Sequence, residues 1–93
     1  MSVTVHIPGP LRTFAGGRGE VVLEGSFALL RDALEALWQK YPGLRDRILT
    51  EEGNVREHIN LFVGSELIRY TGGLATPLFA SAEISIIPAI SGG

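Results

Sequence analysis

One segment of the sequence has the periodicity of an amphipathic helix, and its apolar face requires another element of the chain to pack against. Its apolar residues recur at spacings of three and four and are Phe27, Leu30, Leu34, Leu37, Trp38 and Tyr41. Polar residues fill the opposite face, namely Arg31, Asp32, Glu35 and Gln39. Because only one face is apolar, that face must be buried against another element, and a sheet is the economical partner.

The ends of this helix carry recognisable signals. Ser26 is the predicted N-cap, since its hydroxyl can accept a hydrogen bond from a free backbone N–H of the first turn. Pro42-Gly43 is expected to end the helix. We expect one further turn within Leu44–Leu49, followed by a polar loop from Thr50 to Asn54.

Strand patterns lie on both sides of the helix. Val3–Pro8 alternates with a period of two, and Glu20–Glu24 is short and β-branched, so the two are predicted to form a hairpin. Three more strands are expected after the helix. They begin at Glu57, with Ile59, Leu61 and Val63 on one face and Asn60 and Phe62 on the other, continue in Glu66–Tyr70, and end in Ala82–Pro88, with Ile84 and Ile86 pointing one way.

The predicted element order is therefore β-β-α-β-β-β. It indicates an α+β fold, in which one main helix packs across one face of a mixed four- to five-stranded sheet. A chain of 93 residues suits a single domain spanning residues 1–93. Val3, Val5, Ile7, Ile84 and Ile86 are expected to form the sheet side of the core.

Composition argues against several classes of partner. Eight Lys and Arg stand against ten Asp and Glu, so nucleic acid is a poor candidate. No apolar run approaches the roughly 20 residues of a membrane span, and no signal-peptide pattern opens the chain. Cysteine is absent, which removes disulfides and thiol nucleophiles. We expect a cytoplasmic protein.

Side chains suited to catalysis or to metal binding are scarce. His6 and His58 lie on expected strands without clustered carboxylates near them in sequence, and Glu51-Glu52 is typical of a solvated loop. Residues 16–19, Gly-Gly-Arg-Gly, lack the Lys-Ser/Thr of a phosphate-binding loop and favour a hairpin turn. We therefore predict no catalytic residue, no metal site and no bound cofactor.

The chain end is the remaining candidate. Two glycines without a Cβ, Gly92 and Gly93, give a slim end whose terminal carboxyl carbon is sterically open. Residues 89–93 are expected to form a flexible tail, which could extend roughly 16–18 Å at about 3.3–3.6 Å per residue. Such a tail, with Ser91 and Gly92 presenting Gly93, could enter a narrow channel of a partner enzyme.

This combination of element order and chain end resembles the ubiquitin-like sulfur carriers of the MoaD/ThiS family, which have the β-grasp fold. The resemblance covers nearly the whole chain and is densest in residues 59–64, 68–76 and 84–93, which read Ile-Asn-Leu-Phe-Val-Gly, Ile-Arg-Tyr-Thr-Gly-Gly-Leu-Ala-Thr and Ile-Ser-Ile-Ile-Pro-Ala-Ile-Ser-Gly-Gly. The middle segment is most similar to CysO-type carriers of cysteine biosynthesis.

The resemblance implies a two-stage use of Gly93. An E1-like adenylyltransferase/sulfurtransferase would adenylate its carboxylate with ATP, and a sulfur donor would then displace AMP to leave a covalent thiocarboxylate. A sulfur-accepting synthase, either cysteine-synthase-like or the large subunit of molybdopterin synthase, would take the sulfur. The chain itself would be a carrier and not an enzyme.

Two alternatives stay open at this point. The chain could be the small subunit of a molybdopterin synthase in molybdenum cofactor biosynthesis, or a ubiquitin-like modifier that links Gly93 to lysines of other proteins. Lys40 is the only lysine against seven arginines, so poly-chain conjugation has few internal acceptors.

Docking of a partner enzyme needs more than a tail. Alternation sends Phe62 and Ile87 to the sheet face opposite the helix, and we expect them, with Leu67, to form an apolar patch for the activating enzyme. The competing interpretation is that the loop from Pro42 to Glu57 covers this face.

Overall fold

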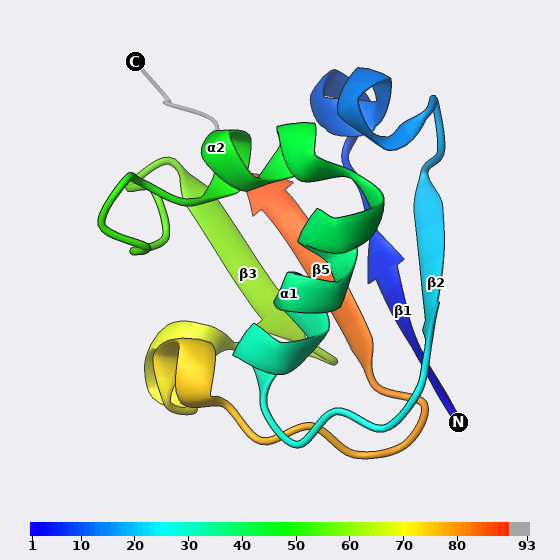
Figure 1. Ribbon diagram of the computed structural model, residues 1–93. Helices are drawn as coiled ribbons and strands as arrows, with labels where there is room; N and C mark the ends of the chain where they lie inside the picture. The colour runs from blue at the N-terminus through cyan, green and yellow to red at the C-terminus, as the bar shows by residue number, and fades with distance from the viewer. Residues whose placement is uncertain (90–93) are drawn as a thin grey trace.

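The structure is a computed structural model that describes residues 1–89 of the chain. Its helices and strands follow the predicted order (Figure 1). The strands are β1 (Ser2–His6), β2 (Glu20–Glu24), β3 (Ile59–Val63), β4 (Glu66–Leu67) and β5 (Glu83–Pro88). The α-helices are α1 (Leu30–Lys40) and α2 (Arg45–Ile48), and the 3-10 helices are η1 (Gly9–Ala15), η2 (Pro42–Leu44), η3 (Ile68–Tyr70) and η4 (Gly73–Ala75).

The strands form one mixed sheet in the order β2-β1-β5-β3-β4. β1 pairs with β2 as the predicted antiparallel hairpin, and β5 lies parallel to β1 and antiparallel to β3. Opposite partners include Val5 and Ile84 across the parallel pair, and Leu61 and Ile86 across the antiparallel pair. The last strand in sequence is thus the central strand of the sheet.

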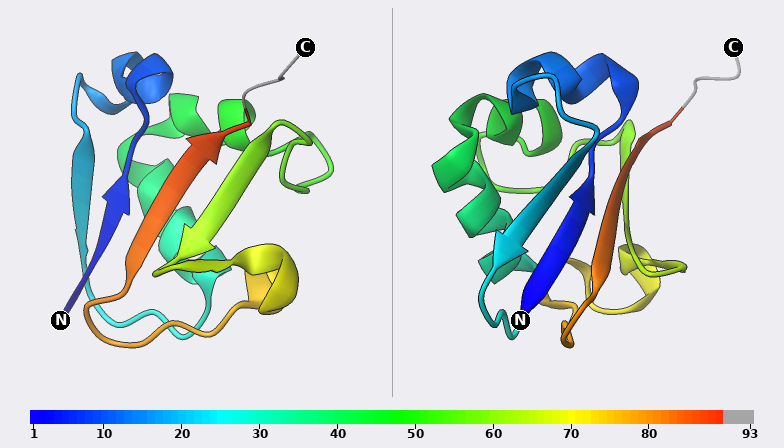
Figure 2. Two further views of the ribbon diagram at one scale, coloured as in Figure 1. Left: turned by 180° about the vertical axis from the view of Figure 1, so that it is seen from behind. Right: turned by 90° about the vertical axis from the view of Figure 1, so that its right-hand side faces the viewer.

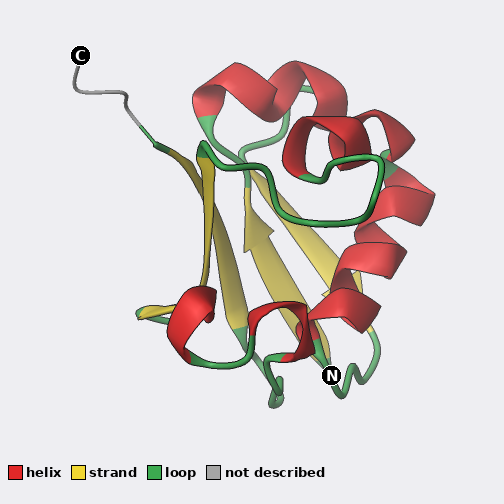
Figure 3. Cartoon of the chain, turned by 90° about the vertical axis from the view of Figure 1, so that its left-hand side faces the viewer, coloured by secondary structure: helices red, strands yellow, loops and turns green. Residues whose placement is uncertain are grey.

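α1 packs across one face of this sheet, and no helix of residues 1–89 lies on the opposite face, which we call the open face (Figure 3). The apolar stripe of α1 is buried, with Leu30, Leu34 and Leu37 at most 1% exposed. Trp38 is also buried, which confirms its prediction as a packing residue. The sheet side of the core contains the alternating residues expected from the sequence, namely Val3, Val5, Ile7, Ile59, Leu61, Val63, Ile84 and Ile86. Val21 and Leu23 of β2, whose face was not predicted, join them. This is the β-grasp arrangement predicted above.

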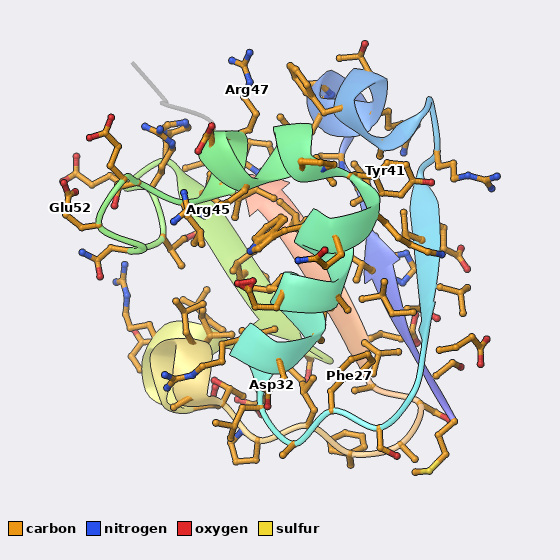
Figure 4. All side chains as sticks on the ribbon, in the orientation of Figure 1. Phe27, Asp32, Tyr41, Arg45, Arg47 and Glu52 are labelled. Atoms are coloured by element: carbon orange, nitrogen blue, oxygen red, sulfur yellow. The ribbon has the colours of Figure 1, made fainter. Side chains whose placement is uncertain are left out.

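The predicted start of the helix was wrong. α1 begins at Leu30, and the Asp32 carboxylate accepts a hydrogen bond from the Leu29 N–H at 3.1 Å. The Ser26 hydroxyl lies 3.4 Å from the Met1 sulfur and is not the cap. Figure 4 places Asp32 in the first turn, with Phe27 before the helix and Tyr41 after it. Both aromatic residues are half-buried and pack against the core from these flanking segments.

Three other boundaries differ from the prediction. The strand predicted for Val3–Pro8 is Ser2–His6, and the chain between it and the turn at residues 16–19 forms the 3-10 helix η1, Gly9–Ala15, which was not predicted. The strand predicted for Glu66–Tyr70 ends at Leu67, because Ile68 turns inward as a buried residue of η3. His58 lies in the turn before β3 and not on the strand.

Within residues 1–89, no helix is both long and apolar enough to cross a membrane.

Candidate functional site

The candidate site lies where the central strand β5 leaves the sheet. β5 is paired on both sides, and the ladder continues one residue beyond it, since the Ala89 N–H donates to the His58 carbonyl at 2.7 Å. Ala89, which the predicted tail includes, is therefore still held by the fold. Ser91, Gly92 and Gly93 lie outside the described residues, so the chemistry predicted for them stays a prediction.

The three predicted docking residues lie on the sheet face opposite α1. Phe62 on β3 is directly opposite Leu67 on β4 and Ser85 on β5, and Ile87 is opposite Asn60, two pairs further along the β3–β5 ladder. Phe62 and Ile87 are therefore diagonal neighbours on one face, a spacing typically of about 7–8 Å, within reach of an aromatic side chain. Ile87 is 47% exposed, while Phe62 and Leu67 are half-buried. We call Phe62, Leu67 and Ile87 the docking patch.

The loop from Pro42 to Glu57 does not cover this patch. Its apolar residues Leu44, Ile48 and Leu49 are buried in the core on the helix side of the sheet. The left view of Figure 2, from behind, shows β3 and β5 with no other segment of residues 1–89 in front of them. This part of the sheet is thus not covered by the loop.

The open face carries two features that the sequence analysis missed. The His6 Nε2 lies 2.6 Å from Glu83 Oε1, an ion pair of partly exposed side chains that joins β1 to β5. Val22 on β2 is 43% exposed on the same face, because its neighbours Val21 and Leu23 are buried. Simple alternation along Glu20–Glu24 could have identified Val22. The pairing of His6 with Glu83 depends on a strand neighbour far away in sequence.

A hollow of about 360 Å³ lies beside Ile87 at the end of β5. Its rim includes Pro8 and Arg12, which η1 and the segment before it bring to the place where the chain leaves the sheet. The Arg12 Nε donates to the Ile7 carbonyl at 3.0 Å, and its guanidinium lies against Gly19, where a Cβ would come within 3.0 Å of it. A side chain at position 19 would therefore require the Arg12 guanidinium to shift by a few tenths of an ångström. The Gly16–Gly19 segment itself is a turn before β2.

No group of three metal-ligating side chains occurs among residues 1–89. His58 is exposed in its turn, and His6 has only the single carboxylate of Glu83 as a partner. Glu51 and Glu52 are exposed in the loop after α2, and Figure 4 shows Glu52 pointing outward from it. The described part of the chain therefore brings together an apolar patch and a held strand end, and no cluster of acids, bases and nucleophiles.

Comparison with known proteins gives these features a context. A model of the ThiS family matches residues 5–93. The sulfur carrier protein CysO of Mycobacterium tuberculosis is 34% identical over 95 residues, covering all of both chains. The CysO chain in the crystal structure of the Amycolatopsis orientalis BexX/CysO complex superposes with a TM-score of 0.86 at 33% identity, over 98% of this chain and 99% of that one. Small archaeal modifier protein 1 of Haloferax volcanii superposes with a TM-score of 0.82 at 28% identity over both full chains.

Proposed function

Since this chain belongs to the ThiS family and is a CysO-like, ubiquitin-like sulfur carrier, we propose that the Gly93 carboxylate is the group on which it carries sulfur. The observation that carries the proposal is the position of β5. The strand nearest Gly93 in sequence is the central strand, and its ladder holds the chain as far as Ala89. Gly93 is the fourth residue after this anchor. Fully extended, residues 90–93 could span at most roughly 13–14 Å at 3.3–3.6 Å each.

The chemistry of the proposal needs no side chain of the carrier. A Gly93 carboxylate oxygen attacks the α-phosphorus of ATP on an E1-like partner, pyrophosphate leaves, and an acyl-adenylate forms. A sulfide-level sulfur then attacks the carbonyl carbon, and AMP leaves with the bridging oxygen. The product is a thiocarboxylate, in which one sulfur has replaced one oxygen.

The docking patch would give the activating enzyme a binding surface on the carrier in addition to the tail. Phe62, Leu67 and Ile87 are apolar and lie on the sheet face opposite α1, and Ile87 is the residue before the last one of β5. A folded enzyme that covers them removes apolar surface from water and fixes where the tail enters. The structure of a related CysO in a complex with BexX supports the idea that carriers of this family dock folded partners.

For the final acceptor, we propose a cysteine-synthase-like enzyme. The full-length similarity to CysO of M. tuberculosis favours this acceptor over the large subunit of molybdopterin synthase. The likeness to small archaeal modifier protein 1 keeps protein conjugation as a second candidate function. Lys40 is the only lysine of this chain, so poly-chain formation would depend on Lys40 or on the N-terminal amine.

Intact-mass measurement tests the carrier proposal. Incubation with an E1-like partner, ATP and sulfide is expected to add about 16 Da, the difference between sulfur and oxygen, and deletion of Gly93 should abolish the gain. The deletion variant should unfold at the same urea concentration as the parent chain, because the described core ends at Ile86. Unchanged mass with each E1-like enzyme of the host would contradict the proposal.

The alternatives predict different products in cells. Isopeptide-linked adducts on other proteins would favour the modifier function, whereas free thiocarboxylate alone would favour the carrier. Stable co-purification with a large catalytic subunit would favour molybdopterin synthase.

A further inference from the structure

The outer edge of β3 carries a second, independent feature. β4 pairs only with Phe62 and Val63, because the chain leaves the strand conformation at Ile68. In the described part of the chain, no strand pairs with Ile59–Leu61 on the side away from β5. An unpaired edge of this kind is a template for another extended chain.

The direction of the backbone groups follows from the ladder with β5. The His58 carbonyl accepts from Ala89, and the Gly64 N–H donates to the Glu83 carbonyl, so the even-numbered residues of β3 face β5. Backbone groups alternate in direction along a strand. The Ile59 carbonyl and the Leu61 N–H therefore face the outer edge. The Ile59 N–H is already used, since it donates to Arg56.

A groove of about 360 Å³ runs along this edge, equal to the liquid volume of roughly twelve waters at 30 Å³ each. Its walls are the segment before β3 and the segment after β4, which Figure 1 shows on the same side of β3. A second hollow of about 400 Å³ shares Val55, Ile68 and Gly73 with it. We call the two together the β3-edge groove.

The charge on this groove differs from that of the whole molecule. Its lining includes three arginines and one glutamate, namely Arg31, Arg56, Arg69 and Glu57, while the chain has a formal net charge of −2. Among residues 1–89, no carboxylate oxygen lies within 4.0 Å of a side-chain nitrogen of these three arginines, since the ion pairs there are His6–Glu83 and Arg45–Asp46. Arg56 is held in place, since its Nε donates to the Asp46 carbonyl at 2.8 Å.

We propose that the β3-edge groove binds an extended acidic segment of a partner protein as an additional strand. The Ile59 carbonyl and the Leu61 N–H supply the backbone hydrogen bonds, and the arginines attract alternate carboxylate side chains. A second copy of this chain is a poor occupant, because two edges of the same positive sign repel each other. The groove is also lined by Leu67, so a bound strand would adjoin the docking patch.

NMR titration of the isotope-labelled chain tests this proposal without any sulfur chemistry. The probe is the peptide acetyl-Asp-Val-Glu-Val-Asp-amide. It is expected to cause saturable shifts of the backbone amides of residues 59–61 and of Arg56 and Arg69. The control peptides carry Lys in place of each acidic residue, or an N-methyl group on the central amide, and neither should bind.

A charge-reversed chain provides the matched test on the protein side. Arg31→Glu together with Arg69→Glu changes two exposed side chains that donate no hydrogen bond among residues 1–89, so the fold should persist. Reversal of both charges should weaken the affinity for the acidic peptide by roughly tenfold or more, because charge complementarity is lost. Arg18→Glu, exposed in the turn before β2, should change binding far less.

Three outcomes of the peptide titrations would overturn the proposal. They are shifts confined to Phe62 and Ile87 on the open face, equal binding of the basic peptide, and absence of saturable shifts. Concentration-dependent shifts at residues 59–61 without peptide would instead identify self-association and would also overturn it. All of these readouts are separate from thiocarboxylate formation on Gly93.

Discussion

Ile86 and Ile87 are the same residue type at adjacent positions of β5, yet they lie in opposite surroundings. Ile86 is 2% exposed and packs in the core beneath α1, whereas Ile87 is 47% exposed on the face that carries no helix. One strand thus serves two purposes, with the inward residues holding the fold and the outward ones free to recognise another protein. Stability and partner binding should therefore be separable by substitutions one residue apart.

The largest expected difference between the faces is in stability. Ile86→Ala should lower the free energy of unfolding by about 2–5 kcal/mol, because it removes buried methyl groups and leaves a cavity. That is a large share of the roughly 5–15 kcal/mol typical of a domain. Ile87→Ala should cost less than about 1 kcal/mol, since its side chain is half in water. Urea unfolding of both variants measures this difference. Equal decreases in the free energy of unfolding would contradict the distinction between the two faces.

Partner activation should show the reverse order. Ile87→Asp should slow adenylation of Gly93 by the E1-like enzyme roughly 30-fold, as expected when about 2 kcal/mol of contact at an interface centre is lost. Phe62→Asp should act in the same direction.

Val22→Asp is the matched control for that measurement. Val22 is 43% exposed on the same face, but it lies on β2, at the other end of the sheet from the docking patch. It should leave adenylation within about twofold of the parent chain, as surface changes outside an interface usually do. If Val22→Asp and Ile87→Asp slow the reaction equally, the open face acts only through its overall charge, and the docking patch is not a distinct surface.

The smallest effect is expected at the ion pair on the open face. Glu83→Gln removes the charge partner of His6 but keeps the side chain's shape. Because both side chains are partly exposed, the free energy of unfolding should fall by no more than about 1 kcal/mol. Urea unfolding measures this change too. A loss as large as that of Ile86→Ala would mean that the open face contributes to folding as much as the core does.

The alternating strands could be predicted because burial on one face repeats every second residue. Val3, Val5, Leu61, Ile84 and Ile86 were all placed correctly on the helix side. The positions of Phe62 and Ile87 on the other face follow from the same rule. This periodicity is a local property, so one sequence is enough to show it.

Features that depend on competition between neighbours were missed. Ser26 has the right chemistry for an N-cap, but the chain stays extended through Leu29, and Asp32 supplies the hydrogen bond instead. Ile68 was expected to continue a strand, but its side chain is buried in the core and its backbone forms the first residue of the 3-10 helix η3. Because β4 ends before Ile68, the outer edge of β3 is left without a strand partner. The groove depends on this early end of β4, so it could not be predicted from the sequence pattern.

The central place of β5 also sets an order of events during synthesis. The parallel pairing of β1 with β5 joins residues about 80 positions apart, such as Thr4 and Glu83. It can therefore form only after β5 has left the ribosome. Without β5, the strand pairs of the sheet are the two hairpins β1–β2 and β3–β4, and no described strand joins one to the other. The strand that completes the sheet is also the one that leads to Gly93. Any chain that presents the Gly93 carboxylate to an enzyme therefore already contains the strand that completes the sheet.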